Sequence, residues 1–115
     1  MLRILLVEDE ALIAIVTSTS LEDAGYHVTV ANDGQEGLEI ALQDRPDLII
    51  SDFMMPRMTG LEMIAALRQR NFAAPIVLAT SIPQHLLPTR EGYDAYMSKP
   101  YTEGQLLEVL KSFAP

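Results

Sequence analysis

Short apolar segments alternate with longer amphipathic ones along this chain, and that alternation limits the fold more than any other feature of the sequence. Five segments have the length and composition of strands: residues 3–7, 27–31, 48–50, 75–79 and 94–98. The first, third and fourth are mostly branched apolar residues, which is typical of strands buried on both faces. The second alternates Val28 and Val30 with more polar residues, and the fifth is the weakest of the set.

The amphipathic segments between these strands predict helices. Their expected ranges are residues 10–24, residues 34–42, residues 60–70 and a last helix that begins at Thr102. In the first helix the apolar positions at helical spacing are Leu12, Ile15, Val16 and Leu21. Asp33 stands where a helix N-cap belongs, and Thr102 with Gln105 has the spacing of a capping box.

The regular order of strand and helix predicts an α/β fold with a parallel sheet covered by helices on both faces. The 115 residues suit a single domain, residues 1–115. In an open sheet of this kind, ligands bind beyond the carboxyl ends of the strands. The residues directly after each strand are therefore where chemistry is expected.

Composition excludes several classes of function. Asp and Glu total 16 against 8 Lys and Arg, a formal net charge of −8, which disfavours non-specific binding to nucleic acid or to an anionic membrane. The chain has no cysteine, so a disulfide framework and a thiolate metal site are excluded. No apolar run is long enough to cross a bilayer, and no signal peptide precedes the first strand. We therefore expect a cytoplasmic protein.

Charged and hydroxyl side chains follow the predicted strands at the edge where they converge. Glu8 and Asp9 follow the first strand, Asp52 the third, Thr80 the fourth and Lys99 the fifth. Three carboxylates in a shallow, partly wet site suit a divalent cation such as Mg²⁺, which takes few protein carboxylates and keeps several waters. The alternative is that these acids are solvated loop residues or helix caps.

The same set of groups suggests phosphoryl transfer. A carboxylate beside Mg²⁺ can attack an activated phosphorus and form an aspartyl phosphate. The metal, a lysine and a hydroxyl would then stabilise the charge on the phosphoryl oxygens.

Taken together, these motifs resemble the receiver domain of two-component response regulators, over essentially the whole chain. The matching segments are residues 4–10 (ILLVEDE), residues 52–60 (DFMMPRMTG), Thr80 and Lys99-Pro100. The resemblance implies a doubly wound, flavodoxin-like fold with five strands in the order 2-1-3-4-5. It also implies a phosphoacceptor that takes its phosphoryl group from a histidine kinase or a histidine phosphotransfer protein, with Mg²⁺ or Mn²⁺ as cofactor.

Carried over by position, the resemblance makes Asp52 the phosphoacceptor. Glu8 and Asp9 then hold the metal together with Asp52 and the backbone carbonyl of Met54. Lys99 contacts the phosphoryl oxygens.

The resemblance also implies a switch and three structural positions. Thr80 becomes the hydroxyl that moves toward the phosphoryl group, and Tyr96 the aromatic side chain that swings inward. Pro56 and Gly60 match the turn that closes the phosphorylation loop, and the Lys99–Pro100 peptide bond is expected to be cis, since cis bonds are nearly confined to proline. Thr80 as a plain strand-end hydroxyl and Tyr96 as ordinary packing are the alternatives.

Three features depart from the family pattern. Met54 and Ile82 stand at positions that, by the resemblance, border the path of the hydrolytic water, and neither offers it a hydrogen bond, so we expect slow autodephosphorylation. The segment after Thr80 is short for the family and contains Pro83 and Pro88, so the helix before the fifth strand should be short or distorted and the output surface unusual. Nothing follows Pro115, as in a stand-alone receiver or a piece of a longer protein.

Two other classes of function remain as alternatives. The first is an enzyme of the same architecture. A phosphatase with an aspartate nucleophile would carry a second acid two residues on, where this chain has Met54. A flavin or dinucleotide binder would need a glycine-rich or hydroxyl-rich loop after the first strand, where this chain has Glu8-Asp9-Glu10. A docking domain that is never phosphorylated is the second. We expect no enzyme activity beyond the domain's own phosphorylation and dephosphorylation, no direct contact with nucleic acid or membrane, and a monomer or weak dimer.

Overall fold

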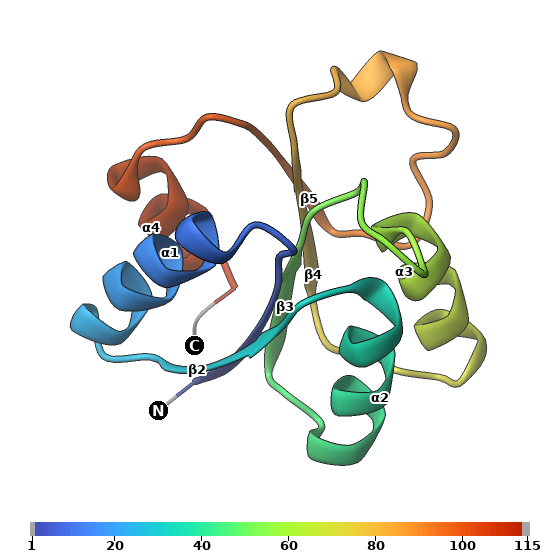
Figure 1. Ribbon diagram of the computed structural model, residues 1–115, viewed down its shortest axis with the longest axis horizontal. Helices are drawn as coiled ribbons and strands as arrows, with labels where there is room; N and C mark the ends of the chain where they lie inside the picture. Colours follow the sequence, from blue (N-terminus) through green and yellow to red (C-terminus); the bar gives the residue numbers. More distant parts are fainter. Residues whose placement is uncertain (1, 114–115) are drawn as a thin grey trace.

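A computed structural model describes residues 2–113 of the chain, and its centre is one five-stranded parallel sheet (Figure 1). The strands are β1 (Arg3–Val7), β2 (His27–Ala31), β3 (Leu48–Ser51), β4 (Ile76–Thr80) and β5 (Ala95–Ser98). Their spatial order is β2-β1-β3-β4-β5, as the family resemblance implied. The predicted strands are confirmed, with boundaries that differ by one residue at most.

Helices cover both faces of this sheet. They are α1 (Ala11–Asp23), α2 (Gly34–Asp44), α3 (Gly60–Gln69) and α4 (Glu103–Lys111). Figure 1 shows α1 and α4 together on one face and α2 and α3 on the other. The doubly wound α/β class is therefore confirmed. No helix among residues 2–113 has the length and apolar character needed to cross a bilayer.

The apolar core is divided by the sheet into two clusters. Leu5 and Val7 of β1 point toward α2 and α3, whereas Ile4 and Leu6 point toward α1 and α4. This alternation buries both faces of β1, and β3 is equally buried along its length. Burial on both faces is the reason that these strands are continuous apolar runs in the sequence.

Side-chain caps define where three helices begin. The Asp33 carboxylate accepts a hydrogen bond of 2.8 Å from the backbone N–H of Glu36 and caps α2. Thr102 forms the expected capping box at the start of α4. Thr59 forms a second capping box with Glu62 at the start of α3, which the sequence analysis missed although the Thr-x-x-Glu spacing was visible.

The apolar face predicted for α1 is wrong at three of its four positions. Leu21 is buried, but Leu12, Ile15 and Val16 are between 59% and 74% exposed. The face that packs on the sheet instead contains Ala14, Thr17 and Leu21. The larger apolar residues Leu12, Ile15 and Val16 therefore lie on the outer side of the helix.

The segment between β4 and β5 contains no α-helix. Its regular structure is the 3₁₀-helix η1 (Gln84–Leu86), in agreement with the expected short or distorted helix. Pro83 and Pro88 bracket this turn and have no backbone N–H to donate. Leu87, directly before Pro88, is extended at ψ 146°, as a residue before proline tends to be.

Candidate functional site

The carboxyl ends of β1, β3 and β5 bring the predicted site residues together. Val7 of β1 is in register with Ser51 of β3, so the next residues, Glu8 and Asp52, emerge side by side. Thr80 of β4 is paired with Ser98 of β5, which places Lys99 at the same edge. Parallel strands whose carboxyl ends coincide therefore gather charged residues that are far apart in the sequence.

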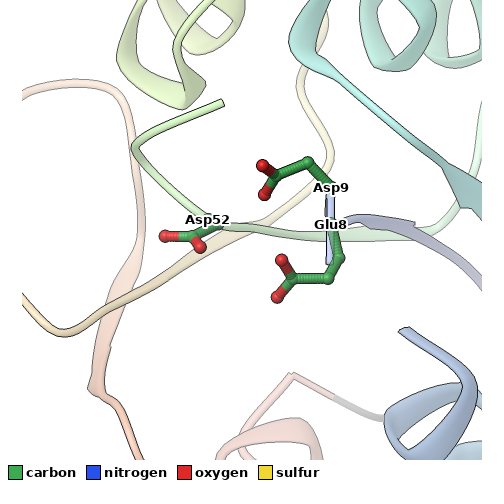
Figure 2. Close-up of side chains that lie close together, drawn as sticks. All are labelled: Glu8, Asp9 and Asp52. Atoms are coloured by element: carbon green, nitrogen blue, oxygen red, sulfur yellow. The ribbon is translucent and has the colours of Figure 1, made fainter. Parts of the chain in front are cut away.

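Three carboxylates converge at this edge. Glu8, Asp9 and Asp52 each offer one carboxylate oxygen, and these oxygens all lie within 4.8 Å of one another (Figure 2). Glu8 is buried, Asp52 is half-buried and Asp9 is exposed. Such a cluster of hard oxygen donors, open to water on one side, fits a divalent cation of the Mg²⁺ type.

Lys99 neutralises part of the charge of this cluster. Its ammonium group donates a hydrogen bond of 2.6 Å to Oε1 of Glu8 and one of 2.9 Å to Oδ2 of Asp52. Burial raises the pKa of the Glu8 carboxyl above its ordinary value, and the hydrogen bond from Lys99 offsets only part of that effect. Burial alone would lower the pKa of Lys99, but its hydrogen bonds to Glu8 and Asp52 raise it. The ammonium group is therefore charged at neutral pH.

The Asp52 main chain is held closely on both sides. Its N–H donates to the Val7 carbonyl at 3.2 Å, and its own carbonyl accepts a 2.8 Å hydrogen bond from the buried Ser51 hydroxyl. A Cβ atom at Gly60 would lie 2.0 Å from the Asp52 carbonyl oxygen, so only glycine fits there. The Gly60 N–H closes the loop by donating to the Phe53 carbonyl at 2.7 Å.

The first turn of α2 supports the same loop from its other side. A Cβ atom at Gly34 would lie 2.1 Å from the Met58 carbonyl oxygen, so the backbones of the helix and the loop are in contact. The Asp33 carboxylate lies 3.5 Å from Nε of Arg57, a residue in the left-handed region at φ 68°. The sequence analysis missed these contacts, because they depend on the path of the loop that contains Pro56.

Thr80 and Tyr96 are joined through one residue, Ile82. The Thr80 hydroxyl accepts a hydrogen bond of 3.3 Å from the Ile82 N–H, and the Tyr96 hydroxyl donates to the Ile82 carbonyl at 2.5 Å. The Lys99 N–H donates to the Thr80 carbonyl at 3.0 Å, and the Lys99–Pro100 bond is cis, as expected.

The predicted residues thus fall into two groups. Glu8, Asp9, Asp52 and Lys99 form one charged cluster. Thr80 adjoins it through the Lys99 backbone, whereas Tyr96 contacts the segment after β4. Their functional roles, like that of the Met54 carbonyl as a metal ligand, remain predictions.

An exposed apolar surface lies beside the charged cluster. It consists of Leu12, Ile15 and Val16 on α1, and we call it the α1 patch. A groove of about 620 Å³ runs between α1 and α4, and its lining joins Leu12 and Val16 to Lys99 and residues near the start of α4. Contiguous exposed apolar surface of this kind is typical of a protein interaction site.

Comparison with known sequences gives the chain a clear set of relatives. A family model of the response regulator receiver domain matches residues 4–111. The alkaline phosphatase synthesis transcriptional regulatory protein PhoP of Bacillus subtilis is 38% identical over 103 residues, which cover 87% of this chain and 43% of PhoP. Response regulator MprA of Mycobacterium leprae is 37% identical over 114 residues, 96% of this chain and 50% of MprA. The chain thus spans about half the length of these curated relatives.

Solved structures match over nearly the full chain. Chemotaxis protein CheY4 of Vibrio cholerae superposes with a TM-score of 0.88 at 34% identity and covers 99% of both chains. Response regulator protein TrrA of Thermotoga maritima, solved in complex with Mg²⁺-BeF, superposes with a TM-score of 0.92 at 30% identity, over 99% of this chain and 100% of that one.

Proposed function

The chain belongs to the family of response regulator receiver domains, and from this premise we propose that it accepts a phosphoryl group on Asp52 in a two-component phosphorelay. The observation that carries the proposal is the ion-paired cluster at the sheet edge. Asp52 lies within 4.8 Å of two further carboxylates and within 2.9 Å of the Lys99 ammonium group. A solvated loop carboxylate is expected to lie in water, without two further carboxylates and an ammonium group beside it.

In the proposed reaction a carboxylate oxygen of Asp52 attacks the phosphorus of a phosphohistidine. The new O–P bond forms as the P–N bond to the donor ring breaks. The ring, protonated on its other nitrogen, takes that electron pair and leaves as neutral imidazole. Negative charge is spread over the three equatorial oxygens of the phosphoryl group, where the Lys99 ammonium can stabilise it. The Thr80 hydroxyl, whose oxygen accepts a hydrogen bond from Ile82, still has its own proton to donate to a phosphoryl oxygen.

The cofactor of this reaction is proposed to be Mg²⁺ or Mn²⁺, held by the Glu8, Asp9 and Asp52 carboxylates and the Met54 carbonyl. When bound, such an ion neutralises charge on the phosphoryl oxygens as the transfer proceeds. The donor set fits, since hard carboxylate and carbonyl oxygens are the ligands that Mg²⁺ prefers.

The donor is proposed to be a histidine kinase or a histidine phosphotransfer protein that docks on the α1 patch. This surface is apolar, lies beside the cluster, and leaves the exposed edge of the site open to an incoming side chain. Leu12, at 74% exposure, is its most accessible member. Burial of such a side chain at an interface is favourable by roughly 1.5–3 kcal/mol.

The aspartyl phosphate is proposed to be long-lived. Met54 and Ile82 are apolar and offer no hydrogen bond that would orient an attacking water. The chemistry of the domain would then be confined to its own phosphorylation and slow dephosphorylation, with no turnover of other substrates.

The remaining proposals concern location and partners. We propose a cytoplasmic protein that is a monomer or weak dimer and acts on a downstream protein target. The relative PhoP is named a transcriptional regulator, but this chain matches 43% of it. We therefore limit the proposal of no direct nucleic-acid contact to the receiver domain.

Intact-mass analysis after incubation with acetyl phosphate tests the phosphoacceptor. We expect a gain of about 80 Da that requires Mg²⁺ and is lost in Asp52→Asn and with EDTA. Asp44→Asn, an exposed acid on α2, is the matched control and should be phosphorylated like the wild type. Equal phosphorylation of Asp52→Asn would overturn the assignment of the site.

A second pair of variants tests the docking surface. Leu12→Asp should slow phosphoryl transfer from a phosphorylated histidine kinase about tenfold while leaving the reaction with acetyl phosphate unchanged. Leu86→Asp makes the same substitution at another exposed leucine, on η1, and should leave both rates unchanged. Equal transfer rates for the two variants would exclude the α1 patch as the donor surface.

A further inference from the structure

Residues 53–59 connect Asp52 to α3, and we call them the β3–α3 loop. The Phe53 N–H donates a hydrogen bond of 2.7 Å to Oδ1 of Asp52, so the loop backbone holds the phosphoacceptor carboxylate directly. The Phe53 carbonyl in turn accepts from the Gly60 N–H at 2.7 Å. The same loop contains Met54, whose carbonyl is a proposed metal ligand. The conformation of the β3–α3 loop therefore bears on both the phosphoacceptor and the metal site.

The β3–α3 loop contains a strained turn at Arg57. The Met58 N–H donates to the Pro56 carbonyl at 2.7 Å, and Arg57 between them has φ 68°. A hydrogen bond that spans one residue of positive φ closes a classic γ-turn, a rare and strained conformation. The left-handed region costs little for glycine but is unfavourable for a residue with a long side chain. Such a conformation persists where its surroundings hold it in place.

The first turn of α2 supplies those surroundings. Oδ1 of Asp33 accepts the 2.8 Å capping hydrogen bond from the Glu36 N–H, and Oδ2 lies 3.5 Å from Nε of Arg57. The Asp33 side chain is only 17% exposed, so its orientation is restricted by its neighbours. Gly34 lies against the following peptide, where a Cβ atom would be 2.1 Å from the Met58 carbonyl oxygen. One carboxylate thus joins the start of the helix to the strained turn.

We propose that Asp33 is a positioning residue of the metal site, and that it acts through Arg57 by holding the loop conformation that presents the Met54 carbonyl to the ion. The inference rests on the proposed function, because it requires a divalent cation at the sheet edge. Asp33 is not one of the three clustered carboxylates, so its effect is indirect. Groups that orient the ligands of a metal ion commonly control its affinity.

The Asp33→Asn variant separates the two roles of this side chain. Asparagine is as good an N-cap as aspartate, so α2 keeps its start, but the amide has no charge to pair with Arg57. Arg57 is 61% exposed, and an exposed ion pair changes an equilibrium constant by at most about fivefold. We expect the dissociation constant of Mg²⁺, titrated by two-dimensional NMR, to rise about threefold. Phosphorylation by acetyl phosphate should then need more Mg²⁺ rather than show a lower rate at saturating Mg²⁺.

Amide hydrogen exchange in EDTA measures the turn without any ligand. The Met58 N–H is protected by its bond to the Pro56 carbonyl, and it should exchange about threefold faster in Asp33→Asn than in the wild type. Gly34→Ala perturbs the same support without a change in charge, because its Cβ atom forces the Met58 carbonyl away. Alanine favours the helix itself, so a loss of Mg²⁺ affinity in this variant, expected to be about tenfold, comes from the loop.

Arg57→Gly provides the decisive background, because glycine adopts positive φ without a partner. In that background Asp33→Asn should change the Mg²⁺ dissociation constant by less than about 1.5-fold. Asp47→Asn removes the same charge from a pair with Arg3, at the other end of β1, and should bind Mg²⁺ as the wild type does. An equal loss of affinity with and without Arg57 would overturn the proposal.

The wild-type titration separates the two levels of the argument. A wild type that binds no Mg²⁺ and gains no phosphoryl group refutes the proposed function. A wild type that binds Mg²⁺, beside an Asp33→Asn variant of the same affinity and the same Met58 exchange rate, refutes the positioning role of Asp33 alone.

Discussion

Replacement of Lys99 by methionine tests the charge balance of the site most directly. The variant keeps the length and apolar stem of the side chain and removes the ammonium group that lies 2.6 Å from Glu8 and 2.9 Å from Asp52. Two neighbouring carboxylates then lack their shared cation. We therefore expect the metal-free variant to be less stable than the wild type and unusually responsive to Mg²⁺.

The magnitude follows from burial. Exposed ion pairs contribute about 0–1 kcal/mol, whereas loss of one partner from a buried pair costs about 3–5 kcal/mol. The Lys99 and Glu8 side chains are 15% and 4% exposed, which favours the upper range, but Glu8 can take up a proton and limit the cost. We expect the free energy of unfolding to fall by about 2 kcal/mol at neutral pH, or about 8 °C in the melting temperature.

Thermal unfolding followed by circular dichroism, in EDTA and in Mg²⁺, measures both effects. Mg²⁺ at a hundred times its dissociation constant for the wild type stabilises the wild type by about 2.7 kcal/mol. At the same Mg²⁺ concentration the rise in melting temperature should be larger in Lys99→Met, because no ammonium group competes with the ion for the carboxylates. The deficit in stability measured in EDTA should shrink as the pH falls and Glu8 takes up a proton. Lys111→Met, an exposed lysine at the end of α4, controls for the charge change. Equal melting temperatures in EDTA, or equal Mg²⁺ shifts, would refute the reasoning.

Three further predictions follow from the site. Gly60→Ala should destabilise the protein by about 1–3 kcal/mol and impair phosphorylation with acetyl phosphate, because the new Cβ atom would lie 2.0 Å from the Asp52 carbonyl oxygen. Gly104→Ala is the control: the nearest neighbour of its Cβ atom would be at 3.8 Å, so this variant should melt no lower than the wild type. Met54→Asn should shorten the phosphoprotein lifetime about tenfold in a mass-spectrometric decay assay by offering water a hydrogen bond, and an unchanged lifetime would contradict the expected role of this position. Because burial raises the pKa of Glu8 above its ordinary 4.5, the folded protein keeps a proton that the unfolded chain loses first, so the Glu8 contribution to stability falls as pH rises from 4.5 through the raised pKa. The same proton must leave before Mg²⁺ binds, so Mg²⁺ affinity measured by calorimetry should weaken as pH falls through the raised pKa of Glu8, and a pH-independent affinity would argue against Glu8 as a ligand.

The strands were predictable because a strand that is buried on both faces appears in the sequence as a short continuous apolar run. Residues 48–50 and 75–79 could only be buried strands, and the rule that parallel strands meet at their carboxyl ends then brought Asp52 and Lys99 to one edge. Even the boundary at Asp94 has a reason. Its carboxylate accepts hydrogen bonds from Arg68 and Ile76, so it precedes β5 as an anchor outside the strand.

The orientation of α1 could not be predicted in the same way. The helix has an exposed apolar arc of Leu12, Ile15 and Val16 and a buried arc of Ala14, Leu21 and the polar Thr17. Helical periodicity identified the larger apolar residues, grouped Leu21 with the exposed arc, and so did not show which face packs on the sheet. The choice depends on how closely the helix approaches, which only the assembled fold decides.

The contacts between the first turn of α2 and the loop before α3 could not be predicted from the sequence, for a different reason. The contact of Gly34 with the Met58 carbonyl and the pair of Asp33 with Arg57 join segments whose relative path is set by the turn between them. Local patterns describe each segment alone, so such contacts have no signal in either one.

The Glu8–Lys99 bond also links the beginning of the sheet to its last strand. Its partners are 91 residues apart, so the bond cannot form until nearly the whole domain has left the ribosome and β5 has docked beside β4. A nascent chain that ends before residue 99 has the acids of β1 and β3 but neither the ammonium group nor the backbone partner of Thr80. The charged cluster at the sheet edge is therefore assembled only after the last strand of the sheet has been made.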